Sequence, residues 1–129
     1  MCGISGFINC NNHNLSKNTL LQLSDKLEHR GPDDFGIIMG NFIDGNETRE
    51  NGTLGIAHNR LSIIDLSTES RQPMTDINNK VVLAFNGEIY NYKNIREQLT
   101  KRGYIFNNDS DTLVLINAYI EWGVDFILK

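Results

Sequence analysis

Cys2 is the side chain best placed for covalent chemistry, because it lies one residue from the start of the chain. If Met1 is removed, Cys2 carries both a thiol and a free α-amine. An α-amine titrates near ~7.7–8.0, so near neutral pH a useful fraction can accept a proton from the neighbouring thiol. Nucleophile and base then belong to one residue. The alternative is that Cys2 is a small buried apolar residue, as free cysteines usually are.

Asn86-Gly87 could supply the hydrogen-bond donors that such a nucleophile needs. The pair follows the apolar run at residues 81–85. An asparagine amide and a glycine N–H at the end of a strand can both point at a developing negative oxygen. The same dipeptide is a strong signal for a type I′ hairpin turn. Residues 88–91 lead into a helical pattern and not into a returning strand, which weakens the hairpin interpretation.

Three charged side chains could bind the two ends of an amino acid. Arg60 precedes an apolar run, so it lies at or inside a strand. There it forms either an ion pair, with Asp65 or Asp33, or a planar fork for a ligand carboxylate. Glu88 is either a surface charge or a cation ligand. Asp111 either complements a helix N-terminus through the macrodipole or binds a cation. Taken alone, the residues favour the structural alternative for each.

The histidines and cysteines indicate neither a metal site nor a disulfide. The three histidines have no metal-ligand spacing with each other or with a cysteine, so we predict no metal. We expect a structural role for His58, since an α-amine is available as the base. Cys2 and Cys10 flank a strand-like run that would hold them ~26 Å apart. A disulfide needs Cα atoms within about 7 Å, so both thiols are predicted to be free.

Apolar and alternating patterns predict a β-rich middle flanked by helices. Strand patterns lie at residues 2–8, 35–43, 53–59, 61–66 and 81–85. The last run is almost continuously apolar, which is typical of a strand covered on both faces. The connection at residues 44–52 is rich in Gly, Asn and Asp and predicts a loop.

Three helices are predicted around these strands. The first is capped by Ser16 and ends near Gly31-Pro32, the second spans residues 91–102 before Gly103, and the third runs from Ser110 to about residue 123. The apolar residues at 124–128 predict the start of a further element. The predicted apolar faces are, in order, Leu20, Leu23 and Leu27; Ile95 and Leu99; and Leu113, Ile116, Tyr119 and Ile120.

Composition places the chain among ordinary soluble domains. Its 129 residues suffice for one domain, with 40% hydrophobic and 22% charged residues. The net charge of -4 argues against nucleic acid or an anionic membrane as the main partner. No apolar run reaches the ~18 residues of a membrane span, and the N-terminus lacks the pattern of a signal peptide. We therefore expect a cytoplasmic location.

Five motifs fall in the order in which they occur in one family. They are Met1-Cys2-Gly3-Ile4, His29-Arg30-Gly31-Pro32-Asp33, residues 57–65, residues 85–91 and Ser110-Asp111-Thr112. With them the chain closely resembles the glutaminase domain of asparagine synthetase, a class II glutamine amidotransferase of the N-terminal-nucleophile hydrolases. The motif at residues 29–33 resembles that of asparagine synthetases more than that of the sugar-phosphate or purine-pathway members of this class. The resemblance implies an α+β fold, an αββα sandwich of two stacked, mainly antiparallel sheets covered by helices.

The resemblance also implies a mechanism. The Cys2 thiolate would attack the side-chain amide carbon of glutamine, and Asn86 with the Gly87 N–H would hold the oxyanion. Ammonia would leave first, and water would then hydrolyse the thioester to release glutamate. The α-amine would shuttle protons in both steps. We expect Arg30 to line the pocket or to order its loop.

A second set of residues would bind the substrate, again by resemblance. Arg60 would hold the α-carboxylate of glutamine, and the backbone of Ile63 and Ile64 would line the same pocket. Glu88 and Asp111 would bind the α-ammonium. Glutamine would then be recognised by both charged ends, with its side-chain amide facing the nucleophile.

The chain also departs from the family. The resemblance covers residues 1–129, but the family's glutaminase domain is longer, so we expect one domain that is incomplete at its C-terminal end. A Gly-rich nucleotide loop such as Ser-Gly-Gly-x-Asp is missing. We expect no cofactor on this chain, with ATP and Mg used only by a synthetase domain or subunit elsewhere. That partner would make asparagine from aspartate with the ammonia. The alternatives are an amidotransferase with another acceptor, such as a sugar, and a silent glutamine-binding or assembly module.

Overall fold

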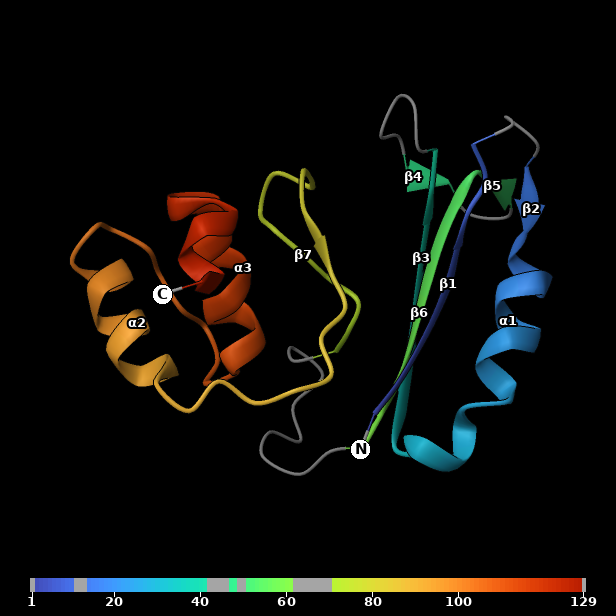
Figure 1. Cartoon of the computed structure of the whole chain (residues 1–129), viewed down its shortest axis with the longest axis horizontal. Coiled ribbons are helices and arrows are strands. Elements are labelled where there is room, and N and C mark those ends of the chain that lie inside the picture. Colours follow the sequence, from blue (N-terminus) through green and yellow to red (C-terminus); the bar gives the residue numbers. More distant parts are fainter. Residues whose placement is uncertain (1, 11–13, 42–46, 49–50, 62–70, 129) are drawn as a thin grey trace.

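Antiparallel sheets and helices make up this α+β protein (Figure 1). The computed structural model describes residues 2–10, 14–41, 47–48, 51–61 and 71–128. The α+β class predicted from the sequence is confirmed. Most of the short strand predicted at 61–66 lies outside the described residues.

The main sheet has four strands, and the strands that pair at its centre are distant from each other in sequence. In spatial order the strands are β1 (Gly3–Ile8), β6 (Leu54–Arg60), β3 (Asp34–Gly40) and β4 (Glu47–Thr48). All neighbouring pairs are antiparallel. The register sets Gly3 opposite Asn59 and Asp34 opposite Arg60. The start of β1, the end of β6 and the start of β3 therefore meet at one end of the sheet.

These strands confirm the predicted strands at 2–8, 35–43 and 53–59, with different ends. The connection predicted as a loop at 44–52 contains two short strands. One is β4, and the other is β5 (Asn51–Gly52), which pairs with β2 (Leu15–Ser16) in a separate two-stranded sheet. Such short pairings carry little sequence signal, because alternation over two residues is no pattern.

The apolar run at 81–85 is not a strand covered on both faces, so that prediction was wrong. Only β8 (Val82–Leu83) is a strand, and it pairs with the equally short β7 (Met74–Thr75). All five residues of the run are half-buried. The ladder ends early because the N–H of Phe85 donates to a side chain, the Oε1 of Gln72, at 2.6 Å.

Asp76 fixes the turn that joins β7 to β8. Its carboxylate accepts the backbone N–H groups of Asn78 at 3.0 Å, Lys80 at 2.6 Å and Val81 at 2.7 Å. Burial raises the pKa of Asp76, but these N–H donors outweigh burial and hold the pKa below its ordinary value. One carboxylate thus binds three N–H groups in the turn of the hairpin that precedes residue 85.

Helix α1 (Lys17–Asp25) begins as predicted, because the Ser16 hydroxyl accepts the N–H of Thr19. A 3-10 helix (Glu28–Arg30) follows before residue 31. Leu20 is fully buried, but Leu23 is 38% exposed, so the predicted apolar face was partly wrong. Ser24 faces the sheet instead, since its hydroxyl donates to Asn59 Oδ1 at 2.6 Å.

Helices α2 (Tyr92–Thr100) and α3 (Asp111–Trp122) confirm the other two predicted helices. Ser110 caps α3 through its hydroxyl, which accepts the N–H of Thr112 at 3.2 Å. Gly103 and Gly123 follow the two helices with positive φ, at 96° and 70°. A 3-10 helix (Val124–Leu128) occupies the segment predicted to begin a further element. None of the described helices is long and apolar enough to cross a membrane.

The buried side of α3 matches the predicted apolar face only in part, since Ile116 is buried as predicted. Tyr119 and Ile120 are 42% and 41% exposed, whereas Val114 and Ala118 are fully buried against Ile95 and Leu99 of α2. Thr112 and Ile116 are buried as well. Figure 1 shows the reason, since α3 lies between α2 and β7 and is covered from two sides.

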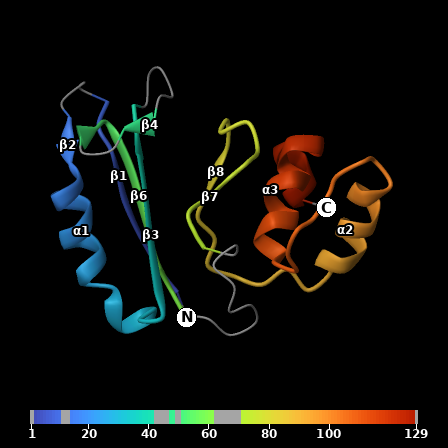
Figure 2. The ribbon, with the colours of Figure 1, turned by 180° about the vertical axis from the view of Figure 1, so that it is seen from behind.

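Figures 1 and 2 show the order of the layers. Helix α1 covers one face of the main sheet, where Leu20 packs with Met39 and Ala57. The β7–β8 hairpin lies on the other side of the sheet, and α3 and α2 follow beyond it. The segment after the hairpin runs toward the end of the sheet where β1 begins.

Candidate active site

The backbone carbonyl of Cys2 joins two distant segments of the chain. It accepts Arg30 Nε at 3.2 Å and Asn86 Nδ2 at 3.1 Å. Arg30 ends the 3-10 helix after α1, and Asn86 follows β8. Arg30 was expected to line the pocket or to order its loop, and its side chain binds the backbone of Cys2. The nucleophile predicted from the sequence and one of its predicted oxyanion donors lie in direct contact.

The thiol of Cys2 lies at the end of β6. Its Sγ accepts the N–H of Leu61 at 3.4 Å and lies 3.8 Å from the carbonyl oxygen of the same residue. The side chain is half-buried, and Cys2 and Cys10 are both free cysteines. Because Leu61 follows Arg60, the thiol is adjacent to the predicted carboxylate-binding residue.

Arg60 is the last residue of β6 and is only 9% exposed. Its carbonyl accepts the N–H of Asp33 at 3.0 Å. A side chain on Gly31 would overlap with the carbonyl of Asn59, so a glycine is needed for the loop to pass this close to β6. Ile63 and Ile64, and Asp65 as an ion-pair partner, lie outside the described residues.

Asp34 binds a second arginine, Arg71, at the end of the sheet where Arg60 lies. It forms an ion pair with Arg71, Oδ1 to Nη2, at 2.8 Å, and stands opposite Arg60 in the register. Burial raises the pKa of Asp34, but the hydrogen bond of Arg71, the N–H of Phe35 and the charge of Arg71, with a smaller effect of Arg60, bring the pKa below its ordinary value. One ion pair, between Asp34 and Arg71, thus lies at the end of the sheet where β6 ends.

The segment from Phe85 to Ile89 carries the other predicted site residues and is fixed at both ends. The Phe85 N–H donates to Gln72 as described, and its carbonyl is 3.2 Å from His58 Nε2. At the far end, the Ile89 N–H donates to Asp111 Oδ2 at 3.0 Å. The three residues between them, Asn86, Gly87 and Glu88, are exposed.

This geometry decides between the alternatives for Asn86-Gly87. The segment leads from β8 into α2 and not into a returning strand, so the hairpin interpretation was wrong. A side chain on Gly87 would lie 2.7 Å from the ring of Phe85, so the ring would have to shift to admit one. The segment presents the amide side chain of Asn86 beside the backbone carbonyl of Cys2.

The two predicted ammonium ligands lie at the far end of this segment. Asp111 is the first residue of α3, is half-buried, and contacts the segment through the residue after Glu88. It therefore does more than complement the helix macrodipole. Glu88 is exposed between the two fixed ends. The Asp111 carboxylate thus contacts the segment that contains Glu88 and Asn86.

His58 is fully buried in β6, where it faces Ile4 and Gly36 of the neighbouring strands. Burial lowers the pKa of His58, the hydrogen bond with Phe85 raises it, and Arg60 lowers it, leaving the pKa below its ordinary value. Its Nδ1 has no hydrogen-bond partner among the described residues. A neutral ring that donates from Nε2 fits this environment, as does the structural role expected for His58.

Two contributors to the site had no signal in the sequence. Gln72, which is 8% exposed, holds the N–H of residue 85, and Leu61 supplies backbone atoms to the thiol. Gln72 belongs to a polar stretch without periodicity. Backbone contacts such as those of Leu61 depend on the fold and not on the side chain. Neither contribution could be identified from residue type.

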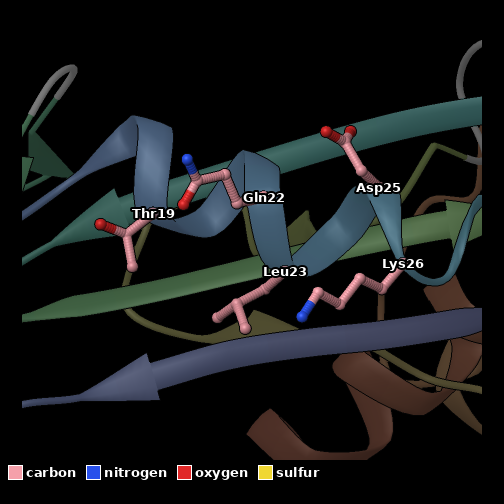
Figure 3. A pocket seen from close by; sticks show the side chains of 5 residues that line it. All are labelled: Thr19, Gln22, Leu23, Asp25 and Lys26. Atoms are coloured by element: carbon pink, nitrogen blue, oxygen red, sulfur yellow. The ribbon is translucent and has the colours of Figure 1, made fainter.

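A surface hollow of about 500 Å³ lies elsewhere. It is lined by Thr19, Gln22, Leu23, Asp25 and Lys26, which belong to α1 and the residue that follows it (Figure 3). No predicted site residue lines it, and α1 covers the face of the sheet opposite the β7–β8 hairpin. Within the described part of the chain, no group of three or more His, Cys, Asp or Glu residues could hold a metal ion.

The fold and the site together define a class of protein. The chain is an α+β protein with a cysteine directly before its first strand, next to an asparagine amide and a buried arginine, a combination suited to acyl transfer. A family model described as a glutamine amidotransferase domain matches residues 1–129. The chain belongs to this family and is therefore an enzyme domain.

Relatives among characterised proteins agree with the predicted resemblance. The chain is 35% identical over 128 residues to asparagine synthetase [glutamine-hydrolyzing] 1 of Arabidopsis thaliana, and 35% identical over 130 residues to asparagine synthetase [glutamine-hydrolyzing] 3 of Bacillus subtilis. It is 34% identical over 128 residues to the asparagine synthetase [glutamine-hydrolyzing] of Asparagus officinalis. Each comparison covers 98% of this chain but only 19% or 20% of the relative. The chain thus spans about a fifth of their length.

Proposed function

We propose that this domain hydrolyses glutamine to glutamate and ammonia through a thioester on Cys2. The observation that carries the proposal is the hydrogen bond from Asn86 Nδ2 to the carbonyl oxygen of Cys2, at 3.1 Å. It brings an amide donor to the residue that holds the nucleophile. The family match and the relatives support the same reaction.

The proposed reaction has two steps. The thiolate of Cys2 attacks the side-chain amide carbon of glutamine, and the oxyanion is held by Asn86 Nδ2 and the Gly87 N–H. The carbon–nitrogen bond breaks, the nitrogen takes a proton, and ammonia leaves. Water then attacks the thioester, glutamate is released and the thiol is restored. The α-amine of Cys2, freed by removal of Met1, accepts and returns the proton in each step.

Substrate recognition in this proposal uses both ends of glutamine. Arg60 binds the α-carboxylate, with the backbone of Ile63 and Ile64 beside it. Glu88 and Asp111 bind the α-ammonium. The exposure of Glu88 and the position of Asp111 next to its segment support this assignment, as does the burial of Arg60 near the thiol.

We further propose that the ammonia serves a synthetase domain or subunit outside this chain. That partner would use ATP and Mg to make asparagine from aspartate, and the present domain would need no cofactor of its own. The names of the relatives and the fraction of their length that this chain spans support this proposal. The antiparallel sheets and the helices that flank them are compatible with an N-terminal-nucleophile αββα sandwich, which we propose as the fold, in a cytoplasmic protein.

Intact mass before and after incubation with 6-diazo-5-oxo-norleucine tests the proposal. This electrophile mimics glutamine and reacts with a nucleophile in a formed glutamine site. The starting mass should lack Met1, and the protein should gain one adduct and release ammonia from glutamine. Cys2→Ala should abolish the adduct, whereas Cys10→Ala, which removes the other cysteine, should keep it. Absence of an adduct despite loss of Met1 would overturn glutamine hydrolysis and favour a silent module.

A further inference from the structure

The buried side chain of Gln72 connects the two ends of the Phe85–Ile89 segment, and we propose that it is a positioning residue for glutamine hydrolysis. The inference rests on the proposed function, since it assigns Gln72 to the same site. Among the described residues, the hydrogen bonds of the Gln72 side chain go neither to Cys2 nor to a predicted substrate ligand. It acts through Phe85 on one side and through Thr112 on the other.

The carbonyl oxygen of the Gln72 side chain fixes the start of the Phe85–Ile89 segment. This oxygen, Oε1, accepts the Phe85 N–H at 2.6 Å, and Phe85 immediately precedes Asn86. The carbonyl of Phe85 is in turn 3.2 Å from His58 Nε2. Both polar groups of residue 85 are therefore bound by buried side chains. This fixes the direction in which the chain enters the predicted oxyanion site.

The amino half of the same amide reaches the other end of the site. Its Nε2 donates to Thr112 Oγ1 at 3.2 Å, and both residues are buried, with 8% and 3% exposure. Thr112 follows Asp111, whose carboxylate accepts the Ile89 N–H. One planar side chain thus links the residue before Asn86 to the helix start that fixes residue 89.

Gln72 is itself fixed against the sheet. A side chain on Gly36 would overlap with the carbonyl of Gln72, so β3 and this residue are in close backbone contact. Because β3 pairs with β6, the link extends to the strand that ends beside the Cys2 thiol. An amide is suited to this place, since it accepts on one atom and donates from the other.

The expected effect of losing the amide is on the rate of the chemical step. Misplacing a catalytic group by ~1 Å can cost about a hundredfold in rate. Asp111 keeps its place without Gln72, because α3 has its own cap in Ser110. We therefore expect Gln72→Met to lower kcat for glutamine hydrolysis by about ten- to a hundredfold, with KM changed less than about threefold. Gln98→Met, on the exposed surface of α2, should leave both constants unchanged.

A second pair of variants keeps the test valid if Gln72→Met does not fold. Thr112→Val removes the acceptor with little change of shape, and Thr112→Ser retains it. Thr112→Val should lower kcat for glutamine hydrolysis, as Gln72→Met does. Thr112→Ser should keep kcat close to that of the parent protein. Equal kcat in the two Thr112 variants, or an unchanged kcat in folded Gln72→Met, would overturn the positioning role while glutamine hydrolysis by the parent protein still stood.

Amide hydrogen exchange provides a readout that does not need activity. In Gln72→Met, exchange of the Phe85 N–H should become about tenfold faster or more, while that of Leu99 in the α2 core should not change. If the parent protein hydrolyses no glutamine, the proposed function fails, and the positioning role fails with it. Unchanged exchange at Phe85 in an active protein would overturn the positioning role alone.

Discussion

Asn86 donates a hydrogen bond from Nδ2 to the carbonyl oxygen of Cys2 at 3.1 Å, although 84 positions of sequence separate the two residues. The contact is made where β1 begins and after β8 has ended. Because an amide NH₂ group has two hydrogens, one can bind the Cys2 carbonyl while the other remains for a ligand. The same side chain can thus hold the backbone of the nucleophile and serve a developing oxyanion.

We predict that Asn86→Ala lowers kcat for glutamine hydrolysis by about 10²- to 10³-fold, the usual cost of removing one oxyanion donor. KM should change little, since the contact strengthens in the transition state. Steady-state kinetics of ammonia release measures both constants. Asn91→Ala is the matched control, because Asn91 is exposed and its side chain makes no capping hydrogen bond to α2. Equal losses in the two variants would contradict the role of Asn86.

Arg60→Lys tests whether Arg60 recognises the substrate carboxylate through its planar guanidinium or only through its positive charge. Lysine keeps the positive charge but loses the planar fork that binds a carboxylate through two N–H groups. Since hydrogen bonds to charged groups contribute about 1.5–3 kcal/mol, we expect KM for glutamine to rise about tenfold or more. Arg102→Lys, at the exposed ion pair with Glu121, should leave KM unchanged. An unaltered KM in folded Arg60→Lys would show that Arg60 is only structural.

Two leucines of α1 test the packing of the main sheet. Leu20→Ala should lower the free energy of unfolding by about 2–5 kcal/mol, because Leu20 is fully buried among the side chains of β3 and β6. Leu23→Ala should cost much less, since Leu23 is 38% exposed. Urea denaturation of the two variants measures the difference. Similar losses would mean that both leucines face the core, as the sequence had suggested.

The contrast between these leucines shows what the sequence could predict. Helix starts and ends were predicted correctly where the interaction is local, as for the Ser16 and Ser110 caps and for Gly103. The buried faces were partly wrong because they depend on distant partners. Ser24 faces the sheet through Asn59, 35 residues away, and no helical pattern contains that information.

The site residues also fall into those that the sequence could predict and those that it could not. Cys2 and Asn86 belong to the five motifs that occur in the order of the family. They could be predicted as site residues because the resemblance assigns each a role. Gln72 could not, since its partners Phe85 and Thr112 lie 13 and 40 residues away and a polar residue near a proline is typical of loops. Only the three-dimensional arrangement shows that one amide binds both.

His58 predicts a pH dependence of stability that does not require activity. Burial is the main cause that brings its pKa below the ordinary value of 6.5. The unfolded chain therefore binds a proton at a higher pH than the folded protein does, so stability is fully present above about pH 6.5 and is lost as the pH falls toward the lower folded pKa. Protonation would also place a hydrogen on Nδ1, which has no partner in the described part of the chain.

His58→Gln tests this account, since a glutamine amide can still donate to the carbonyl of Phe85 but does not titrate. Urea denaturation at about pH 7.5 and about pH 5.5 should show a loss of stability in the parent protein that the variant lacks. His29→Gln, at an exposed position in the 3-10 helix after α1, is the control and should retain the loss. The same pH dependence in His58→Gln as in the parent protein would mean that another group titrates, and that the ring of His58 is not kept neutral by its burial between β1 and β3.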